Sequence, residues 1–183
     1  MQTSTVTIVE YRPEWPAMAE AAIAEVRAVL GDTITAIEHM GSTSVPGLAA
    51  KPIIDLMAAA SDLDAVAART DALAAAGFER HHNTMADRLL YARGEDVMHR
   101  THLLHIVEAS TWEERNQRIL RDHLRMHPED VRRYAELKYA IVAAGTSMGD
   151  YAAAKTELIQ ELTDRARAER GLPSVPVWEK AAR

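Results

Sequence analysis

Residues 37–58 constrain the fold most, because they combine two short apolar runs, a glycine–hydroxyl turn and a single acid. The segment reads IEHMGSTSVPGLAAKPIIDLMA, so one apolar run ends at Gly41-Ser42 and the next carries Asp55. A carboxylate on an otherwise apolar strand has to be paired, hydrogen-bonded or bound to a metal ion. The pattern predicts two strands joined by a turn that can approach a ligand closely.

The turn itself has the residue types of an anion site. Gly41 allows the backbone to come close to a ligand, and successive N–H groups in such a turn form an anion-binding nest. Ser42, Thr43 and Ser44 add hydroxyl groups. These features make Gly41, Ser42 and Thr43 candidates for phosphate binding. The structural alternative is a corner between strands whose hydroxyls satisfy only the local backbone.

Asp55 is the candidate ligand for a divalent ion, Mg²⁺ or Mn²⁺, on the phosphates. Side chains two positions apart share one face of a strand, so a second acid is expected at position 57, where the chain has Met57. A methionine offers no hard oxygen ligand, which weakens the metal-site interpretation. The alternative for Asp55 is a carboxylate that caps a loop or pairs with Lys51 or an arginine.

Composition limits the classes of function. The chain has 183 residues, 48% apolar and 26% charged, with a net charge of −6 and no cysteine. The length fits one domain over residues 1–183. The acidic balance disfavours nucleic acid as a partner, and the lack of cysteine excludes disulfides and thiolate chemistry. No segment resembles a signal peptide or a membrane span, so we expect a soluble cytoplasmic protein. The sequence does not indicate an oligomeric state.

The predicted secondary structure changes along the chain, from mixed strands and helices to helices alone. The predicted strands are residues 5–9, 33–40, 51–59, 78–82, 88–93 and 101–108. The predicted helices are residues 13–30, 62–76, 110–126, 128–145 and 150–170. The chain therefore divides into a mixed part over about residues 1–109, a helical part over about 110–170 and an extended tail over 171–183.

Two tyrosine–lysine pairs stand out in the helical part. Tyr134 with Lys138, and Tyr151 with Lys155, are four residues apart and so share a helix face. Such pairs can direct ammonium groups towards the phosphates of a ligand. The alternative is ordinary packing of the tyrosines, with the lysine stems covering apolar surface.

The histidine-rich strand supplies one further candidate. His102 and His105 point to opposite faces of a strand, because their separation is odd. His105 is a candidate metal ligand or general base. The alternative is a half-buried histidine bonded to the neighbouring backbone. Glu38 and Glu108 are candidates for the missing carboxylate if the order of the strands brings either one close to Asp55.

Several of these segments together resemble the GrpB family. The most specific is HMGSTSVPGLAAKPIIDL, and THLLHIVE, LRDHLRMHPED, RYAELK and DYAAAK follow it in order, so the resemblance covers roughly residues 5–165. It implies an α+β fold of the nucleotidyltransferase superfamily, a small mixed sheet flanked by helices with a C-terminal helical cap. It also implies that Met40, Gly41, Ser42 and Asp55 match the superfamily pattern, and that Met57 occupies the place of its second acid.

The resemblance and the residues together predict metal-assisted transfer of a nucleotidyl group from a nucleoside triphosphate to a small acceptor. In this hypothesis Asp55 holds the ion and His105 assists it or accepts a proton. The expected nucleotide- and phosphate-binding residues are Gly41, Ser42, Thr43, Lys51, Lys138, Tyr151 and Lys155. Two alternatives stay open: a binding module that keeps the cleft without catalysis, and another metal-dependent activation of a small acid or amine.

Overall fold

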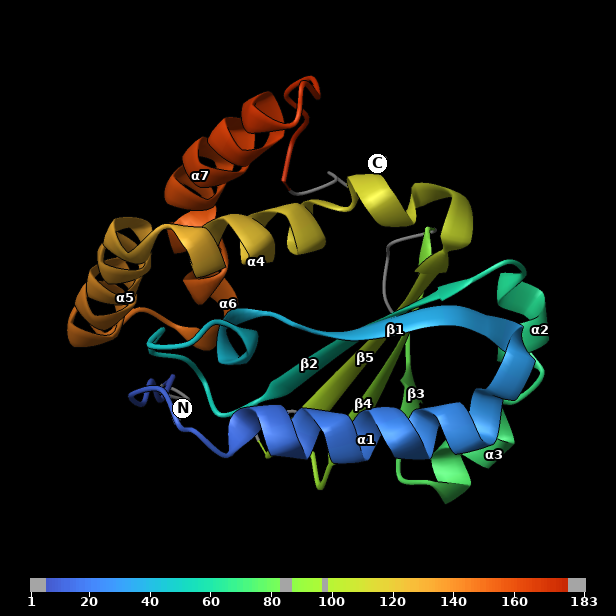
Figure 1. Ribbon diagram of the computed structural model, residues 1–183. Helices are drawn as coiled ribbons and strands as arrows, with labels where there is room; N and C mark the ends of the chain where they lie inside the picture. Colours follow the sequence, from blue (N-terminus) through green and yellow to red (C-terminus); the bar gives the residue numbers. More distant parts are fainter. Residues whose placement is uncertain (1–5, 83–86, 97–98, 178–183) are drawn as a thin grey trace.

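The computed structural model describes residues 6–82, 87–96 and 99–177, and these fold into a mixed sheet with helices on both sides (Figure 1). The five strands lie in the order β1-β2-β5-β4-β3. Their bounds are β1 Ile34–Met40, β2 Ile54–Ala60, β3 Glu79–His81, β4 Arg88–Gly94 and β5 Arg100–Glu108. The α+β class predicted from the sequence is confirmed.

Strand β2 lies in the interior of the sheet, antiparallel to β1 and parallel to β5. Strand β4 is antiparallel to both β5 and β3. The register pairs Asp55 with Met40 on β1 and with Leu103 on β5. Because side chains alternate along a strand, Asp55 and Met57 lie on one face of β2, and Leu56 lies on the other.

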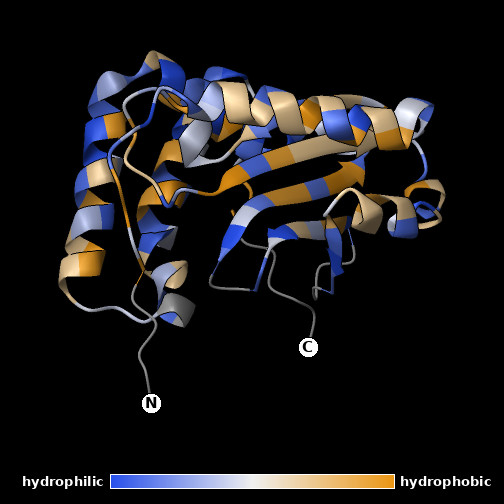
Figure 2. Cartoon of the chain, turned by 90° about the horizontal axis from the view of Figure 1, so that it is seen from below, coloured by the Kyte–Doolittle hydropathy of each residue, from blue (hydrophilic) through white to orange (hydrophobic). Residues whose placement is uncertain are grey.

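The face that carries Leu56 holds the main core. Helix α1 (Trp15–Leu30) runs across this side of the sheet, below it in Figure 1. Its apolar residues recur at helical spacing, which is why one side of the helix is buried against the strands. The short helices α2 (Leu63–Ala67) and α3 (Thr70–Ala75) add Val66 and Leu73 to the same core. Figure 2 shows apolar residues concentrated along the strands, while the helices alternate apolar and polar positions.

The opposite face is covered by the 3₁₀ turn η3 (Ala109–Glu114) and by the helical part, which lies above the sheet in Figure 1. The helical part comprises α4 Asn116–Met126, α5 Pro128–Ala143, α6 Met148–Tyr151, the 3₁₀ turn η4 Ala153–Lys155 and α7 Thr156–Glu169. Met57 is buried here against Met40 and Trp112. Within the described residues, no helix is both long enough and apolar enough to cross a membrane.

The predicted elements differ from the structure in four places. Residues 6–9 form no strand, and Val9 makes only an isolated bridge to Ala50; residue 5 lies outside the described residues. The predicted helix 62–76 is two helices separated at Arg69, which donates to the Val29 carbonyl. The predicted helix 110–126 begins as η3 and is interrupted at Arg115, whose backbone is extended. The predicted helix 150–170 is divided into α6, η4 and α7.

Candidate functional site

Gly41 directly follows strand β1 and lies against Asp55. Its backbone has φ 68° and ψ −172°, a conformation that is essentially restricted to glycine. A side-chain Cβ at this position would lie 3.0 Å from the Asp55 Cβ and closer still to the carboxylate. Both the backbone conformation and the contact therefore require glycine. Strand β1 and strand β2 thus bring the turn and the acid together, as the sequence predicted.

The three hydroxyls of the turn have different roles. Thr43 donates to the Ile53 carbonyl (3.3 Å) and contacts His39 Nε2 (2.9 Å), and Ser44 donates to the Gly41 carbonyl (2.6 Å). Both side chains are buried and stabilise the turn. Ser42 instead accepts a hydrogen bond from Lys138 Nζ at 2.6 Å. Of the predicted hydroxyls, Ser42 faces the candidate site, while Thr43 has the structural role.

Lys138 is the most buried cation of the site, with 1% of its surface exposed. Its ammonium group also donates to the Ala49 carbonyl at 2.8 Å and lies 4.1 Å from the centre of the Tyr134 ring. Burial, reinforced by repulsion from Lys155, lowers the pKa of Lys138 well below its usual value. The Tyr–Lys spacing on α5 therefore does place this lysine against the Gly41 turn.

Lys51 and Lys155 both contact the ring of Tyr151. Their Nζ atoms lie 4.5 and 4.1 Å from the ring centre. Burial and the neighbouring Lys51 lower the pKa of Lys155 to about 8, against the opposing effect of Asp55. Burial also raises the pKa of Tyr151 to about 12, so the phenol stays neutral at physiological pH. The second Tyr–Lys pair thus joins the same site from η4 and α6.

Asp55 is influenced by all three lysines. Burial raises the pKa of Asp55 to about 7, although Lys155, Lys138 and Lys51 each lower it. The side chain is nevertheless partly exposed, and it makes no hydrogen bond or ion pair within the described parts of the chain. A carboxyl group of this pKa changes its protonation state near neutral pH, and only its ionised form can hold a metal ion.

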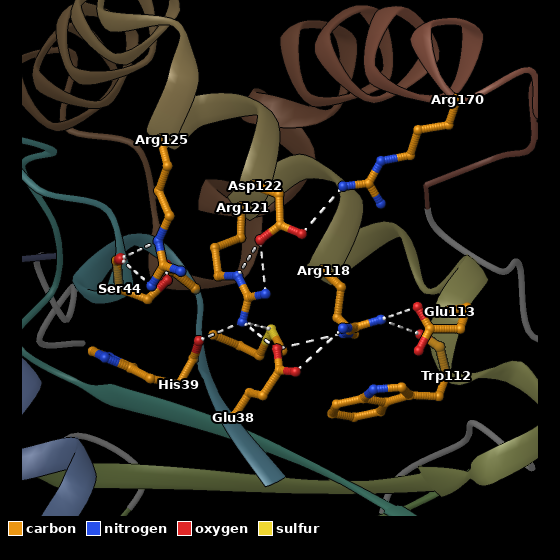
Figure 3. Close-up of polar contacts among 12 residues, drawn as sticks. Glu38, His39, Ser44, Trp112, Glu113, Arg118, Arg121, Asp122, Arg125 and Arg170 are labelled. Carbon is orange, nitrogen blue, oxygen red and sulfur yellow. Dashed lines mark hydrogen bonds and ion pairs between the residues drawn. The ribbon is translucent and has the colours of Figure 1, made fainter. Parts of the chain in front are cut away.

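Glu38, one of the candidates for the missing carboxylate, is bound elsewhere. Its oxygens accept hydrogen bonds from Arg121 Nη1 (2.6 Å) and Arg118 Nη2 (3.2 Å), as Figure 3 shows. Arg118 also pairs with Glu113 at 3.0 Å. Because Glu38 is the strand partner of Met57, it lies on the same sheet face as Asp55. Its charge is neutralised by the two arginines. Glu108, the other candidate, is the exposed last residue of β5, paired with Ala60.

His105 lies on the same face but is not the strand partner of Asp55. It pairs with Met57 on β2 and with Leu90 on β4. Its Nδ1 atom is buried and has no hydrogen-bond partner among the described residues. Burial and the nearby Arg88 lower the pKa of His105 to about 4, which keeps the imidazole neutral at pH 7. His105 lies on the strand next to β2, two residues beyond Leu103, which is the partner of Asp55. His105 is therefore at the margin of the site.

The comparisons with known proteins show the family of this chain. The model of the family described as "GrpB protein" matches residues 5–165. The chain belongs to the GrpB family. A UPF0157 protein of Streptomyces coelicolor is 38% identical over 73% of this chain and 70% of its own length. The crystal structure of the conserved protein GrpB from Enterococcus faecalis superimposes with a TM-score of 0.83 at 28% identity, covering 90% of this chain and 99% of that one.

More distant structures include a cytoplasmic RNA terminal U-transferase, with a TM-score of 0.46, 15% identity and coverage of 82% of this chain and 49% of that one. The Cid1 poly(U) polymerase bound to MgATP gives a TM-score of 0.44 at 11% identity, over 71% of this chain and 45% of the other. At this distance the likeness says nothing about the ligand or reaction of the GrpB chain.

A magnesium site built from protein ligands alone does not fit this GrpB chain. Among the described residues, Asp55 is the one carboxylate whose charge acts on the three lysines of the site; Met57 occupies the neighbouring position on the same face, and Glu38 is bound to arginines. Mg²⁺ is commonly held by one or two carboxylates together with ligand phosphates and water. The residues therefore fit an ion that arrives with a polyphosphate and takes one ligand from Asp55.

Arg125 is a positioning residue for the Gly41 turn. Its guanidinium donates twice to the Ser44 carbonyl, at 2.8 and 3.0 Å, and so fixes the turn from α4 (Figure 3).

Beside Arg125, a recess of about 610 Å³ lies between α1, the turn and α5. Neither Asp55 nor the lysines line that recess, so it is separate from the site described above.

Proposed function

We propose that the cluster formed by the Gly41 turn, Asp55, Lys51, Lys138 and Lys155 binds a nucleoside triphosphate, and that the protein transfers its nucleotidyl group to a small-molecule acceptor. The observation that carries the proposal is the hydrogen bond from Lys138 to Ser42, next to the contact of Gly41 with Asp55. This arrangement joins a glycine–serine turn, an acid and a buried cation in one place.

The balance of charge supports a polyanionic ligand. Lys51 acts on Lys155 and Lys155 acts on Lys138, and within the described part of the chain Asp55 is the acid whose charge acts on all three lysines. The repulsion of Lys155 lowers the pKa of Lys138, and that of Lys51 lowers the pKa of Lys155. Phosphate groups placed among these ammonium groups would relieve the repulsion, and each would accept charge-assisted hydrogen bonds.

The same groups suit the chemistry of transfer. The acceptor oxygen forms a bond to the α-phosphorus, the bond from that phosphorus to the bridging oxygen breaks, and pyrophosphate leaves while the acceptor proton passes to solvent. Negative charge increases on the departing phosphates, where Lys138 and Lys155 would stabilise it. A bound Mg²⁺, with one ligand from Asp55, would supply further neutralisation of phosphate charge. Ser42 and the backbone of Gly41 would hold the phosphates in place.

A binding module without catalysis is the second candidate, and Met57 is the observation that favours it. This side chain is buried against Met40 and Trp112 at the position where a second acid would be expected. One carboxylate is enough to accompany a bound phosphate, whereas two-metal chemistry requires more acidic ligands. Under this alternative the same cluster binds a nucleotide or another phosphorylated metabolite and releases it unchanged.

The test is thermal unfolding against a panel of nucleoside triphosphates, with and without Mg²⁺. A triphosphate at one hundred times its dissociation constant should stabilise the native state by about 2.7 kcal/mol. The Mg²⁺-dependent part of the shift should disappear in Asp55→Asn and persist in Glu38→Gln, which changes another acid of the same sheet face. No shift with any triphosphate would refute the proposal. Where binding is seen, pyrophosphate release with a panel of acceptors distinguishes transfer from binding alone.

A further inference from the structure

A second cluster of potential ligands lies in the helical part, where the ends of two helices meet. It contains His123 near the end of α4, His127 directly after α4, and Glu169 at the end of α7. One nitrogen from each histidine and one carboxylate oxygen lie within 4.8 Å of one another. The rings of the histidines are stacked, with their centres 3.9 Å apart. None of these residues belongs to the site around Asp55.

The two ring nitrogens of His123 have different carboxylate partners, Asp130 at Nε2 and Glu169 at Nδ1. Its Nε2 lies 2.9 Å from an oxygen of Asp130, a carboxylate that is also paired with Arg133 and Arg165. Those contacts keep Asp130 ionised and acceptor-only, so Nε2 must carry the proton. The lone pair of Nδ1 then faces Glu169, whose oxygen is 3.3 Å away.

His127 is oriented in the same way by a backbone group. Its Nδ1 lies 2.8 Å from the carbonyl oxygen of His123, and since a carbonyl can only accept, Nδ1 carries the proton. Nε2 is left with its lone pair and lies 3.8 Å from the other oxygen of Glu169. Outer hydrogen bonds of this kind, to a carboxylate and to a carbonyl, are how proteins orient histidines that bind metal.

We propose that His123, His127 and Glu169 bind one divalent transition-metal ion of the zinc class. Two imidazoles and one carboxylate match the ligands preferred by Zn²⁺, Co²⁺ and Ni²⁺, whereas Mg²⁺ prefers oxygen ligands. Ligand atoms around a tetrahedral Zn²⁺ lie about 3.3 Å apart, given metal–ligand distances near 2.0 to 2.1 Å. The two Glu169 oxygens lie 3.3 Å from His123 Nδ1 and 3.8 Å from His127 Nε2, close to this spacing.

The ion would link the end of α4 to the end of α7. These two helices pack directly against each other, and Ile159 and Leu162 of α7 share a core with Leu124 of α4. Metal binding would therefore stabilise the helical part, which also carries Lys138 and Lys155. This inference does not depend on the proposed function, because the ligands and the readout are separate from those of the phosphate site.

The test is calorimetric titration of the metal-free protein with ZnCl₂, and separately with MgCl₂. We expect one equivalent of Zn²⁺ to bind, with an upward shift of the unfolding temperature, and no comparable binding of Mg²⁺ at this site. His127→Ala and Glu169→Gln should each lower Zn²⁺ affinity at least about tenfold. His99→Ala is the matched control, because His99 pairs with Asp96 at an exposed position and should leave the affinity unchanged.

The choice of variants keeps the test independent of folding. The His127 and Glu169 side chains are 30% and 48% exposed, so their replacement should leave the metal-free protein folded, as its unfolding temperature will show. Substituting Co²⁺ gives a second readout, a visible absorption band that should be lost in His127→Ala. The absence of Zn²⁺ binding, or wild-type affinity in both ligand variants, would overturn the proposal.

Discussion

Glu38 and Asp55 are two acids on the same face of adjacent strands, yet their surroundings shift their pKa values in opposite directions. Burial works to raise the pKa of Glu38, but hydrogen bonds from Arg118 and Arg121 lower it below the usual value. For Asp55, burial prevails over three lysines and raises the pKa to about 7. The lysines act on Asp55 through their charge, without a hydrogen bond or ion pair to its carboxylate among the described residues.

The comparison distinguishes a completed ion-pair network from the cluster that we propose binds a ligand. Around Glu38, the cations are already neutralised, because Arg118 also binds Glu113 and Arg121 also binds Asp122. Around Asp55, Lys138 donates to the neutral oxygens of Ser42 and Ala49. We therefore expect changes around Glu38 to affect stability, and changes around Asp55 to affect ligand binding.

The largest effect should come from Gly41→Ala, which changes the turn that separates the two acids. The backbone conformation costs about 1 to 3 kcal/mol for a non-glycine residue, and the contact with Asp55 adds a further steric cost. We expect the free energy of unfolding, measured by denaturant titration, to fall by at least about 3 kcal/mol. Triphosphate binding should also be lost.

Gly31→Ala is the matched control for this prediction. Gly31 also has a positive φ, of 52°, but a Cβ there would meet nothing within 4 Å. It should therefore show only the backbone cost. Equal losses of stability in Gly41→Ala and Gly31→Ala would mean that the contact between Gly41 and Asp55 has no energetic importance.

The second prediction replaces one cation near Asp55 and one near Glu38 by methionine. Lys138→Met should lower affinity for a triphosphate about 10- to 100-fold, because it removes a charge-assisted hydrogen bond to the ligand. Arg121→Met should leave that affinity unchanged and lower stability by about 1 to 3 kcal/mol, since Glu38 and the His39 carbonyl lose a donor. Calorimetric binding and denaturant unfolding of both variants provide the measurements. The same loss of affinity in both would contradict the division into two kinds of region.

The smallest effect is a difference in pH dependence between Asp55→Asn and Glu38→Gln. The folded protein holds the Asp55 proton up to about pH 7 and the unfolded chain only to about pH 4, so the contribution of Asp55 to stability falls as pH rises through this window. For Glu38 the folded pKa is lowered, so its contribution is present above about pH 4.5 and is lost as pH falls.

The contribution of Asp55 should be about 1 to 2 kcal/mol, because solvent screens a partly exposed side chain, and that of Glu38 should have the opposite dependence on pH. Unfolding free energies of the wild type and the two variants between about pH 3 and 8 measure both contributions as differences between variant and wild type. A wild-type pH slope that is unchanged by Asp55→Asn would show that the raised pKa of Asp55 is absent in solution.

Much of the sheet could be predicted from local patterns. Apolar runs bounded by turn residues located β1, β2, β4 and β5 to within a few residues, and Gly41 and Asp55 marked the connection between the first two. The helices were less accurate at their interruptions. Residues 62–76 and 150–170 have continuous helical composition, but Arg69 binds the Val29 carbonyl and Lys155 lies in the 3₁₀ turn η4. Contacts between distant segments, which composition does not record, determine where those helices break.

The sequence by itself determined that a glycine–serine turn precedes a strand with one acid, because apolar periodicity and turn chemistry act over a few residues. Only the tertiary structure decided which groups surround that acid. It selected Ser42 over Thr43 to meet Lys138, from 96 residues away, and it assigned Glu38 to two arginines at least 80 residues away. It likewise brought Glu169 to His123 and His127. Such pairings depend on how sheet and helices pack, because charges attract across space whatever their distance along the chain.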